Sequence, residues 1–427
     1  MKYALAALLM LTAAPAAMAA ENVTAIPYDS DVNYLKMPDN MYLGEVSGVA
    51  VKSKGHIFVF HRGNTNGPAY GGRAAQLLEF DETGKYVREI GHDLYAWSFA
   101  HTVRVDRDDN VWVADKGSDM VIKFKMPEGR PMLVFGRKPE ASDEGAHPLE
   151  HPNPPLPAVN GMFRQVTDMT WDAAGNTYIS DGYINSRVAK FDKDGNWIMQ
   201  WGDRGTEPGK MNTPHSIASD NQGNIYVADR GNRRIQVFNG TGQVQRIITI
   251  DVPVPPDAQP VIGNPTPANA ANKTQTPGAP WAICITPGPN QVLYASDAFP
   301  GRIYKMTLDG KVLGTIGSGG RSAGKFAWIH EIACPSENNL LVGELLSMRR
   351  NRPRLGHHLT PLHLLTLRPP QQYPNIVPRL PLIQRLPKHL HPRTYRLHRR
   401  PYPHDLYLVP YLHNPSLHSP RHHCPSP

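Results

Sequence analysis

The sequence is poor in cysteine and has no long apolar run. Its 427 residues include three cysteines, Cys284, Cys334 and Cys424, an odd number that does not suit a disulfide framework. The first two lie in strand-like stretches, where we expect buried thiols rather than a pair. No stretch approaches the roughly 20 apolar residues that are needed to cross a bilayer, so we expect no membrane span.

A net positive charge is also missing outside one segment, although the formal net charge of the whole chain is +8. Of the 45 Lys and Arg residues, 13 lie after Met348, where only one acidic residue, Asp405, is found. The rest of the chain holds 32 basic and 36 acidic residues. The basic surface typical of nucleic-acid binding is therefore missing, and we expect no nucleic-acid partner.

The composition changes abruptly after Met348. In residues 349–427, Leu, Pro, His, Gln and Arg supply 57 of 79 residues, and glycine almost vanishes. All five amino acids have codons that can begin with C, which indicates a shifted reading frame; a His/Pro-rich metal-binding or linker tail is the alternative. Sixteen prolines disfavour long helices and central strands, so we expect a disordered tail in either case.

The first 19 residues are typical of a signal peptide. They contain Lys2, an apolar run through Leu11, and a small-residue cleavage motif that ends at Ala19. We therefore expect an exported protein, periplasmic or secreted, in which residues 20–39 precede the folded domain.

One motif recurs along residues 40–348: a Gly-Asn or similar turn, then an apolar strand that ends in a polar residue. The copies end at His61, Asp115, Asp181, Asp229, Asp297 and Glu344. Alternating apolar strands flank each copy and complete about six four-stranded sheets. Closure of such sheets into a ring protects their edges, so the pattern predicts an all-β, six-bladed β-propeller. The tail offers no strands after the last copy, so we expect the last blade to be incomplete and its histidine to be the least firmly held.

Histidine occupies one repeated position in alternate blades. His101, His215 and His330 each lie 14 residues before the acidic residue that ends their motif. The other units have Ser47, Thr167 and either Trp281 or Ile283 at this place. Equivalent positions on the innermost strands of alternate blades lie about 120° apart around the axis, so the three imidazoles are predicted to converge. Three histidines with an open fourth position are typical of catalytic zinc.

The residues that follow the repeated motif return to the rim where the histidines lie, because consecutive strands are antiparallel. They include Arg62, Lys116, Tyr183 and Arg230. Cations and a phenol are therefore predicted to surround the metal. A packed aromatic ring for Tyr183 and a surface salt bridge for Arg230 are the structural alternatives. We expect the repeat aspartates to accept backbone N–H bonds in the turn that follows them.

These features resemble the peptidyl-α-hydroxyglycine α-amidating lyases, a family built on NHL-type repeats. The resemblance extends over about residues 40–346, and its clearest segments are GEVSGVAVKSKGHIFVFHRGN, HTVRVDRDDNVWVAD, ISDGYINSRVAKFDKDGNWIMQWG and PHSIASDNQGNIYVADRGNRRIQVF. It implies an NHL/TolB-like propeller that cleaves a carbinolamide N–C bond and releases a peptide amide and glyoxylate.

The resemblance also assigns roles to individual residues. It implies zinc ligands at His101, His215 and His330, a catalytic tyrosine at Tyr183, and substrate-site arginines at Arg62 and Arg230. In this chemistry zinc acts as a Lewis acid on the substrate oxygen, tyrosine accepts a proton and arginine holds a carboxylate.

A structural calcium is implied as well, held by the backbone of Val49 and Val103 and by Glu331, where the family pattern has aspartate. Two disulfide positions of the animal enzymes hold Ile184 and Tyr226 instead, so we expect stability to come from packing alone.

Two alternatives to the lyase follow from the same sequence. One is a noncatalytic NHL-repeat propeller that binds a protein or small-molecule partner on its face. The other is an inactive, truncated copy of the lyase. No monooxygenase domain that would supply α-hydroxyglycine peptides is recognisable, so the sequence does not name the natural substrate. For the lyase we expect a monomer acting on a small-molecule or peptide substrate.

Overall fold

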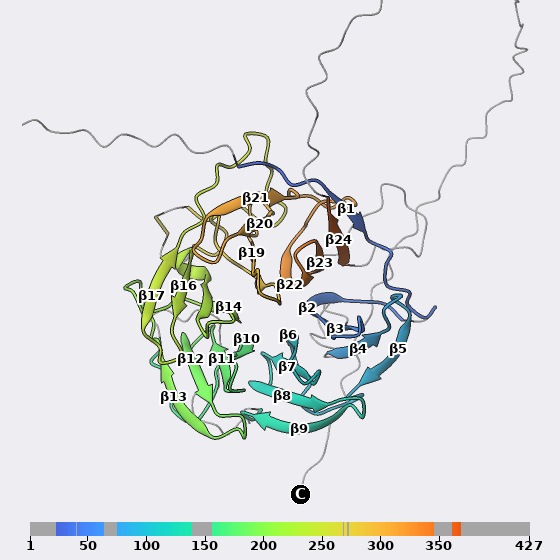
Figure 1. Ribbon diagram of the computed structural model, residues 1–427, viewed down its shortest axis with the longest axis vertical. Helices are drawn as coiled ribbons and strands as arrows, with labels where there is room; N and C mark the ends of the chain where they lie inside the picture. The colour runs from blue at the N-terminus through green and yellow to red at the C-terminus, as the bar shows by residue number, and fades with distance from the viewer. Residues whose placement is uncertain are drawn as a thin grey trace, which may run out of the picture. The chain divides into compact units, whose positions relative to one another are not determined.

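The protein is described by a computed structural model that covers residues 23–39, 41–63, 75–138, 156–267, 269–270, 273–345 and 361–368. These residues form 24 strands and one short 3-10 helix, η1 (Arg230–Asn232). The strands make six antiparallel four-stranded sheets around a common centre (Figure 1). The predicted all-β, six-bladed propeller is confirmed. No helix within the described ranges is long and apolar enough to cross a membrane.

Each of the first five blades is a run of four consecutive strands, with the first strand innermost. Blade one contains β2 (Glu45–Val51), β3 (Ile57–Arg62), β4 (Gln76–Phe80) and β5 (Tyr86–Ile90). Blade two contains β6 (Ala100–Val105), β7 (Val111–Asp115), β8 (Met120–Lys125) and β9 (Arg130–Phe135). Blade three contains β10 (Asp168–Trp171), β11 (Thr177–Asp181), β12 (Arg187–Phe191) and β13 (Trp197–Trp201).

The second half of the ring repeats this order. Blade four contains β14 (Pro214–Ser219), β15 (Ile225–Asp229), β16 (Arg234–Phe238) and β17 (Val244–Ile248). Blade five contains β18 (Ile283–Ile285), β19 (Leu293–Ser296), β20 (Ile303–Met306) and β21 (Val312–Ile316). Blade six contains β22 (Ile329–Ser336), β23 (Asn339–Glu344), β24 (Leu362–Leu367) and β1 (Tyr28–Asp31). Each innermost strand contacts the innermost strands of both neighbouring blades, and β22 contacts β2, so the ring closes.

The Gly-Asn motif forms the turn between the first and second strands of a blade. In blade four, Asp220 Oδ1 accepts hydrogen bonds from the backbone N–H groups of Gln222 and Asn224. Gly223, between them, has φ of 82°, a region that side chains with a Cβ rarely adopt. The strand that follows, β15, is buried along its whole length because other strands pack on both of its faces.

The repeat aspartates fix the entry to the innermost strands. The Asp115 carboxylate accepts backbone N–H bonds from Ser98 and Phe99, which precede β6, and from Ser118, in the turn after β7. The bond from Ser118 was expected from the sequence. The bonds to the segment before β6 were not, and they position the strand that carries His101.

Blade six is complete, contrary to the expectation from the sequence. Strand β24 comes from the compositionally unusual segment and pairs with β23 on one side and with the N-terminal strand β1 on the other. Leu362, Leu365 and Leu367 are buried, and the buried His363 contacts Glu344 Oε2 at 3.1 Å. The stretch LHLLTL contains no proline and has enough apolar residues to fill the position of the third strand. The prolines around it hid this local strand pattern.

The propeller strands therefore reach beyond the expected limits of 40 and 348, since β1 and β24 lie outside them. The predicted signal peptide, residues 1–19, lies outside the described residues. So does the tail that was expected to be disordered, except for residues 361–368.

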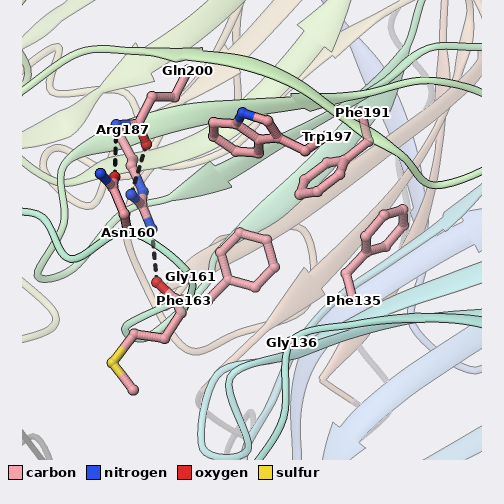
Figure 2. A pocket seen from close by; sticks show the side chains of 10 residues that line it. Phe135, Gly136, Asn160, Gly161, Phe163, Arg187, Phe191, Trp197 and Gln200 are labelled. Atoms are coloured by element: carbon pink, nitrogen blue, oxygen red, sulfur yellow. Dashed lines mark hydrogen bonds between the residues drawn. The ribbon is translucent and has the colours of Figure 1, made fainter.

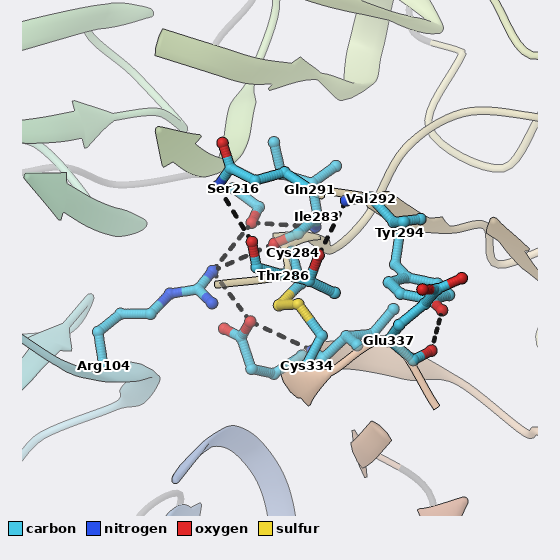
Figure 3. Close-up of a disulfide and its surroundings, with 12 residues drawn as sticks. Arg104, Ser216, Ile283, Cys284, Thr286, Gln291, Val292, Tyr294, Cys334 and Glu337 are labelled. Carbon is cyan, nitrogen blue, oxygen red and sulfur yellow. Dashed lines mark hydrogen bonds and ion pairs between the residues drawn. A yellow bond between two sulfur atoms is a disulfide. The ribbon is translucent and has the colours of Figure 1, made fainter. Parts of the chain in front are cut away.

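Cys284 and Cys334 form a disulfide with their Cα atoms 6.1 Å apart (Figure 3). The expectation of two unpaired buried thiols, and of stability from packing alone, is wrong. Both residues are buried as expected, but they lie on β18 and β22, the adjacent innermost strands of blades five and six. The bond ties the closing blade to its neighbour covalently.

Removing this disulfide is expected to destabilise the fold. For the 50-residue separation, the chain-entropy model gives a loss of about 4 kcal/mol in the free energy of unfolding for the double variant Cys284→Ala/Cys334→Ala. Denaturant unfolding of this variant and of the oxidised protein measures the difference. Reduction of the unmodified protein should reproduce the effect, and equal midpoints for all three samples would contradict it.

Candidate metal centre

The three predicted histidines converge at the centre of the ring. His101 lies on β6, His215 on β14 and His330 on β22, and all three side chains are buried. Their ring centroids are 4.6 to 4.8 Å apart. One ring nitrogen from each histidine lies within 4.8 Å of the others. Among the His, Cys, Asp and Glu side chains of the described residues, these three form the group that could hold a metal ion.

The neighbouring blade fixes the tautomer of each histidine. The Nδ1 atoms of His101, His215 and His330 lie 2.7, 2.8 and 2.7 Å from backbone carbonyl oxygens of Thr167, Trp281 and Ser47, respectively. A carbonyl oxygen only accepts, so each Nδ1 carries the proton and each Nε2 keeps a lone pair. The acceptors are the residues at the same register position in blades one, three and five, which resolves the choice between Trp281 and Ile283.

Burial lowers the pKa of all three histidines well below the ordinary value, and neighbouring cations lower it further. Those cations are Arg62 and Lys116 for His101 and His330, and Arg230 for His215 and His330. The imidazoles are therefore neutral at physiological pH, the state that binds a metal ion. Three neutral Nε2 atoms facing one point fit a zinc ion in both charge and ligand type.

Tyr183 is part of this centre. Its Oη lies 3.2 Å from His101 Nε2 and 3.2 Å from His215 Nε2. The residue follows β11 and is buried, so blade three delivers the phenol to the histidines. Lys116 Nζ lies 4.4 Å from the centroid of its ring and Arg230 Cζ 5.4 Å.

The two predicted arginines lie beside the histidines. Arg62, the last residue of β3, donates from Nε to the carbonyl oxygen of Ala100 at 2.9 Å, and its Cζ lies 3.8 Å from the centroid of the Phe99 ring. Arg230 follows β15, and its Cζ lies 4.0 Å from the centroid of the Trp281 ring. Both guanidinium groups are thus held against aromatic faces, which fixes their orientation.

The structure adds the aromatic rings of Phe99 and Trp281 to the site, and it places Lys116 beside Tyr183 as the sequence predicted. Lys116 lies over both Phe99 and Tyr183. A sequence signal for Lys116 existed, because it follows Asp115 as Arg230 follows Asp229. Trp281 was a candidate for the repeated position but had no predicted role at the site, and Phe99 carried no signal, since a lone aromatic residue is ordinarily core.

The residues proposed for calcium do not fit that ion. Val49, Val103 and Glu331 lie on innermost strands, but Glu331 Oε1 is 3.0 Å from Arg104 Nη2 and its Oε2 accepts from Thr102 Oγ1 at 3.1 Å. Calcium takes six to eight oxygen ligands. Here a guanidinium, which has only donors and repels a cation, already occupies the carboxylate.

A cavity of about 530 Å³ lies at the outer strands of blades two and three, and no histidine of the metal centre lines it (Figure 2). Phe135, Phe191 and Trp197 line it, and Arg187 donates to Gln200 Oε1 at 2.7 Å at one end. Aromatic rings and glycines make up most of its lining, and Arg187 is the one charged residue among the lining residues. The histidine centre is therefore the candidate active site.

Comparison with known proteins finds an NHL repeat and similarity to amidating enzymes. The NHL repeat model matches residues 211–238, which include β14, β15 and β16. The chain is 32% identical over 226 residues to peptidyl-glycine alpha-amidating monooxygenase B of Xenopus laevis, a match that covers 48% of this chain and 24% of that protein. It is 28% identical over 254 residues to a probable peptidyl-alpha-hydroxyglycine alpha-amidating lyase of Caenorhabditis elegans, covering 55% and 67%.

A third relative carries no enzyme name. NHL repeat-containing protein 3 of Homo sapiens is 30% identical over 226 residues, covering 50% of this chain and 57% of that protein. A solved streptogramin B lyase structure is 14% identical with a TM-score of 0.47, covering 80% and 98%. The chain spans about a quarter of the length of the frog monooxygenase. It is a six-bladed β-propeller that carries an NHL repeat and is similar in sequence to named peptidyl-α-hydroxyglycine α-amidating lyases.

Proposed function

We propose that the protein is a zinc-dependent lyase that cleaves the N–C bond of a peptidyl-α-hydroxyglycine-like group to give a peptide amide and glyoxylate. The observation that carries this proposal is the convergence of three neutral histidines with Tyr183, whose Oη lies 3.2 Å from two of their Nε2 atoms. The sequence similarity to named lyases supports the same chemistry.

His101, His215 and His330 would hold the zinc ion through Nε2, each oriented by its Nδ1 hydrogen bond to a main-chain carbonyl. When bound, zinc supplies a Lewis acid that polarises an oxygen of the substrate.

We propose that Tyr183 accepts the proton of the substrate hydroxyl. As that proton leaves, the carbon that carries the hydroxyl becomes the aldehyde of glyoxylate and the C–N bond breaks. The electron pair of that bond goes to the amide nitrogen, which takes up the proton, so the reaction balances without an oxidant or reductant. Lys116 and Arg230, which lie against the Tyr183 ring, stabilise negative charge on the phenol oxygen.

The arginines suit the carboxylate end of such a substrate. A guanidinium presents its N–H groups in a fork geometry that matches a carboxylate. Arg230 lies over the Trp281 ring, and Arg62 lies over the Phe99 ring, with its Nη1 also 2.9 Å from Glu45 Oε2. We propose that they orient the carboxylate of the α-hydroxyglycine group beside Tyr183.

The noncatalytic propeller remains the second candidate, because NHL repeat-containing protein 3 matches to a similar extent. The hypothesis of an inactive, truncated copy rested on an incomplete sixth blade. The structure removes that reason, since blade six is complete and His330 is buried like the other two histidines. We further propose that the protein is exported and acts as a monomer on a small-molecule or peptide substrate.

A glyoxylate assay on the chain from residue 20 to 427 tests the proposal. We expect one zinc per chain and zinc-dependent release of glyoxylate from an α-hydroxyglycine-extended peptide, with none from the matched glycine-extended peptide. Bound zinc without glyoxylate would reject this substrate and favour the binding propeller. Absence of both zinc and glyoxylate would indicate an inactive copy.

A further inference from the structure

A buried charged network lies beside the histidines in the central channel. Arg104 Nε and Nη2 donate to the two carboxylate oxygens of Asp168 at 2.9 and 2.6 Å, and Nη2 also lies 3.0 Å from Glu331 Oε1. Figure 3 shows the Arg104 side chain extending toward Ser216 and Ile283. Asp168 and Glu331 are 0% and 1% exposed, so their carboxylates need a compensating cation, and Arg104 supplies it.

This network joins the innermost strands of five blades. Ser216 Oγ on β14 donates to Asp168 Oδ2 on β10 at 2.9 Å, and the backbone N–H of Ile283 on β18 donates to Ser216 Oγ at 3.2 Å. Thr102 Oγ1 on β6 donates to Glu331 Oε2 on β22 at 3.1 Å. Blades two to six are therefore connected through a single cluster of side chains.

The cluster is directly attached to the metal centre. Glu331 follows His330 in the sequence, and Ser216 follows His215. A cation at this point holds the strands at a fixed spacing just beside the histidines. A structural divalent ion would serve the same purpose, and the lyase resemblance places calcium at Glu331.

We propose that Arg104 takes the place of a bound calcium ion as the internal cation of this channel, so that the protein holds no calcium at Val49, Val103 and Glu331. Glu331 Oε1 lies 3.0 Å from Arg104 Nη2 and Glu331 Oε2 accepts from Thr102 Oγ1, while the neighbouring Asp168 carboxylate accepts from Arg104, Ser216 Oγ and the backbone N–H of Ile217. The positive guanidinium also repels a second cation at hydrogen-bond distance. This inference is independent of the lyase proposal, because calcium binding and stability can be measured without substrate.

Thermal unfolding tests this inference. The zinc-loaded protein is prepared in buffer stripped of calcium, and its Tm is measured before and after calcium is added. For the unmodified protein we expect no stoichiometric calcium by metal analysis and no change in Tm at about 5 mM calcium, which exceeds the Kd range of weak extracellular sites. The Arg104→Ala variant leaves Asp168 and Glu331 facing each other without a cation. It should melt at a lower temperature, and calcium should raise its Tm by about 2–4 °C.

The matched control is Arg187→Ala. Arg187 is a buried arginine that pairs with Asp181 at 2.9 Å in blade three, away from the central cluster. We expect this variant to lose stability without responding to calcium. Stoichiometric calcium in the unmodified protein, or the same calcium response in both variants, would overturn the inference. If Arg104→Ala refolds only when calcium is present, this dependence on calcium also supports the inference.

Discussion

The His215→Ala variant is expected to lose zinc and to release glyoxylate on the order of 10³-fold more slowly than the unmodified protein. His215 lies near the middle of the site, with its Nε2 3.2 Å from Tyr183 Oη and its ring 4.8 Å from both other histidine rings. Two histidines cannot complete the ligand set of a catalytic zinc site. The Lewis acid contributes several kcal/mol to such reactions, and about 1.4 kcal/mol corresponds to tenfold in rate.

Zinc content and the rate of glyoxylate release should be measured on the same preparations. His56→Ala is a suitable control, because His56 is a partly exposed histidine that contacts Glu79 at 2.9 Å in blade one, outside the metal centre. It should keep both zinc and activity. Full zinc content together with an unchanged rate in His215→Ala is the result that would remove the histidines from the mechanism.

The Tyr183→Phe variant is expected to keep its zinc and its fold but to lower kcat by about 10²–10⁴-fold, the range for loss of a positioned acid or base. The substitution removes only the hydroxyl that lies between His101 and His215. The ring, with Lys116 and Arg230 packed against it, stays. KM should change much less than kcat, because the phenol acts on the proton that moves during the reaction.

Tyr178→Phe provides the comparison for this variant. Tyr178 is a fully buried tyrosine of the same blade, and its hydroxyl donates to Asp172 Oδ2 at 2.8 Å rather than to a histidine. It should lose some stability and retain kcat. If Tyr183→Phe keeps the normal kcat, the proton acceptor must be another group.

The sequence predicted the part of the site that follows from the blade repeat. The histidines, Arg62, Tyr183 and Arg230 occupy register positions, and a repeat converts register into position around the axis. The same logic reaches Lys116. The repeat does not identify Phe99, and it gives the position of Trp281 without showing that its ring packs against Arg230.

Features that depend on pairing between distant and inequivalent positions were not predictable in this way. Cys284 and Cys334 do not share a register position, so nothing in the repeat indicated that their side chains meet. Arg104 is one charged residue in an otherwise ordinary strand, and only the fold shows that Asp168 and Glu331 surround it. The strand at 362–367 was concealed by the prolines on either side.

The pairing of β1 with β24 also determines when the metal centre can be completed. The N-terminal strand is synthesised first and β24 is synthesised after all the other strands, so β1 has no partner to pair with until β24 has been made. His330 belongs to the blade that these two strands complete. The strands that carry His101 and His215 can thus form their blades before β24 is available, whereas the blade that carries His330 is completed last.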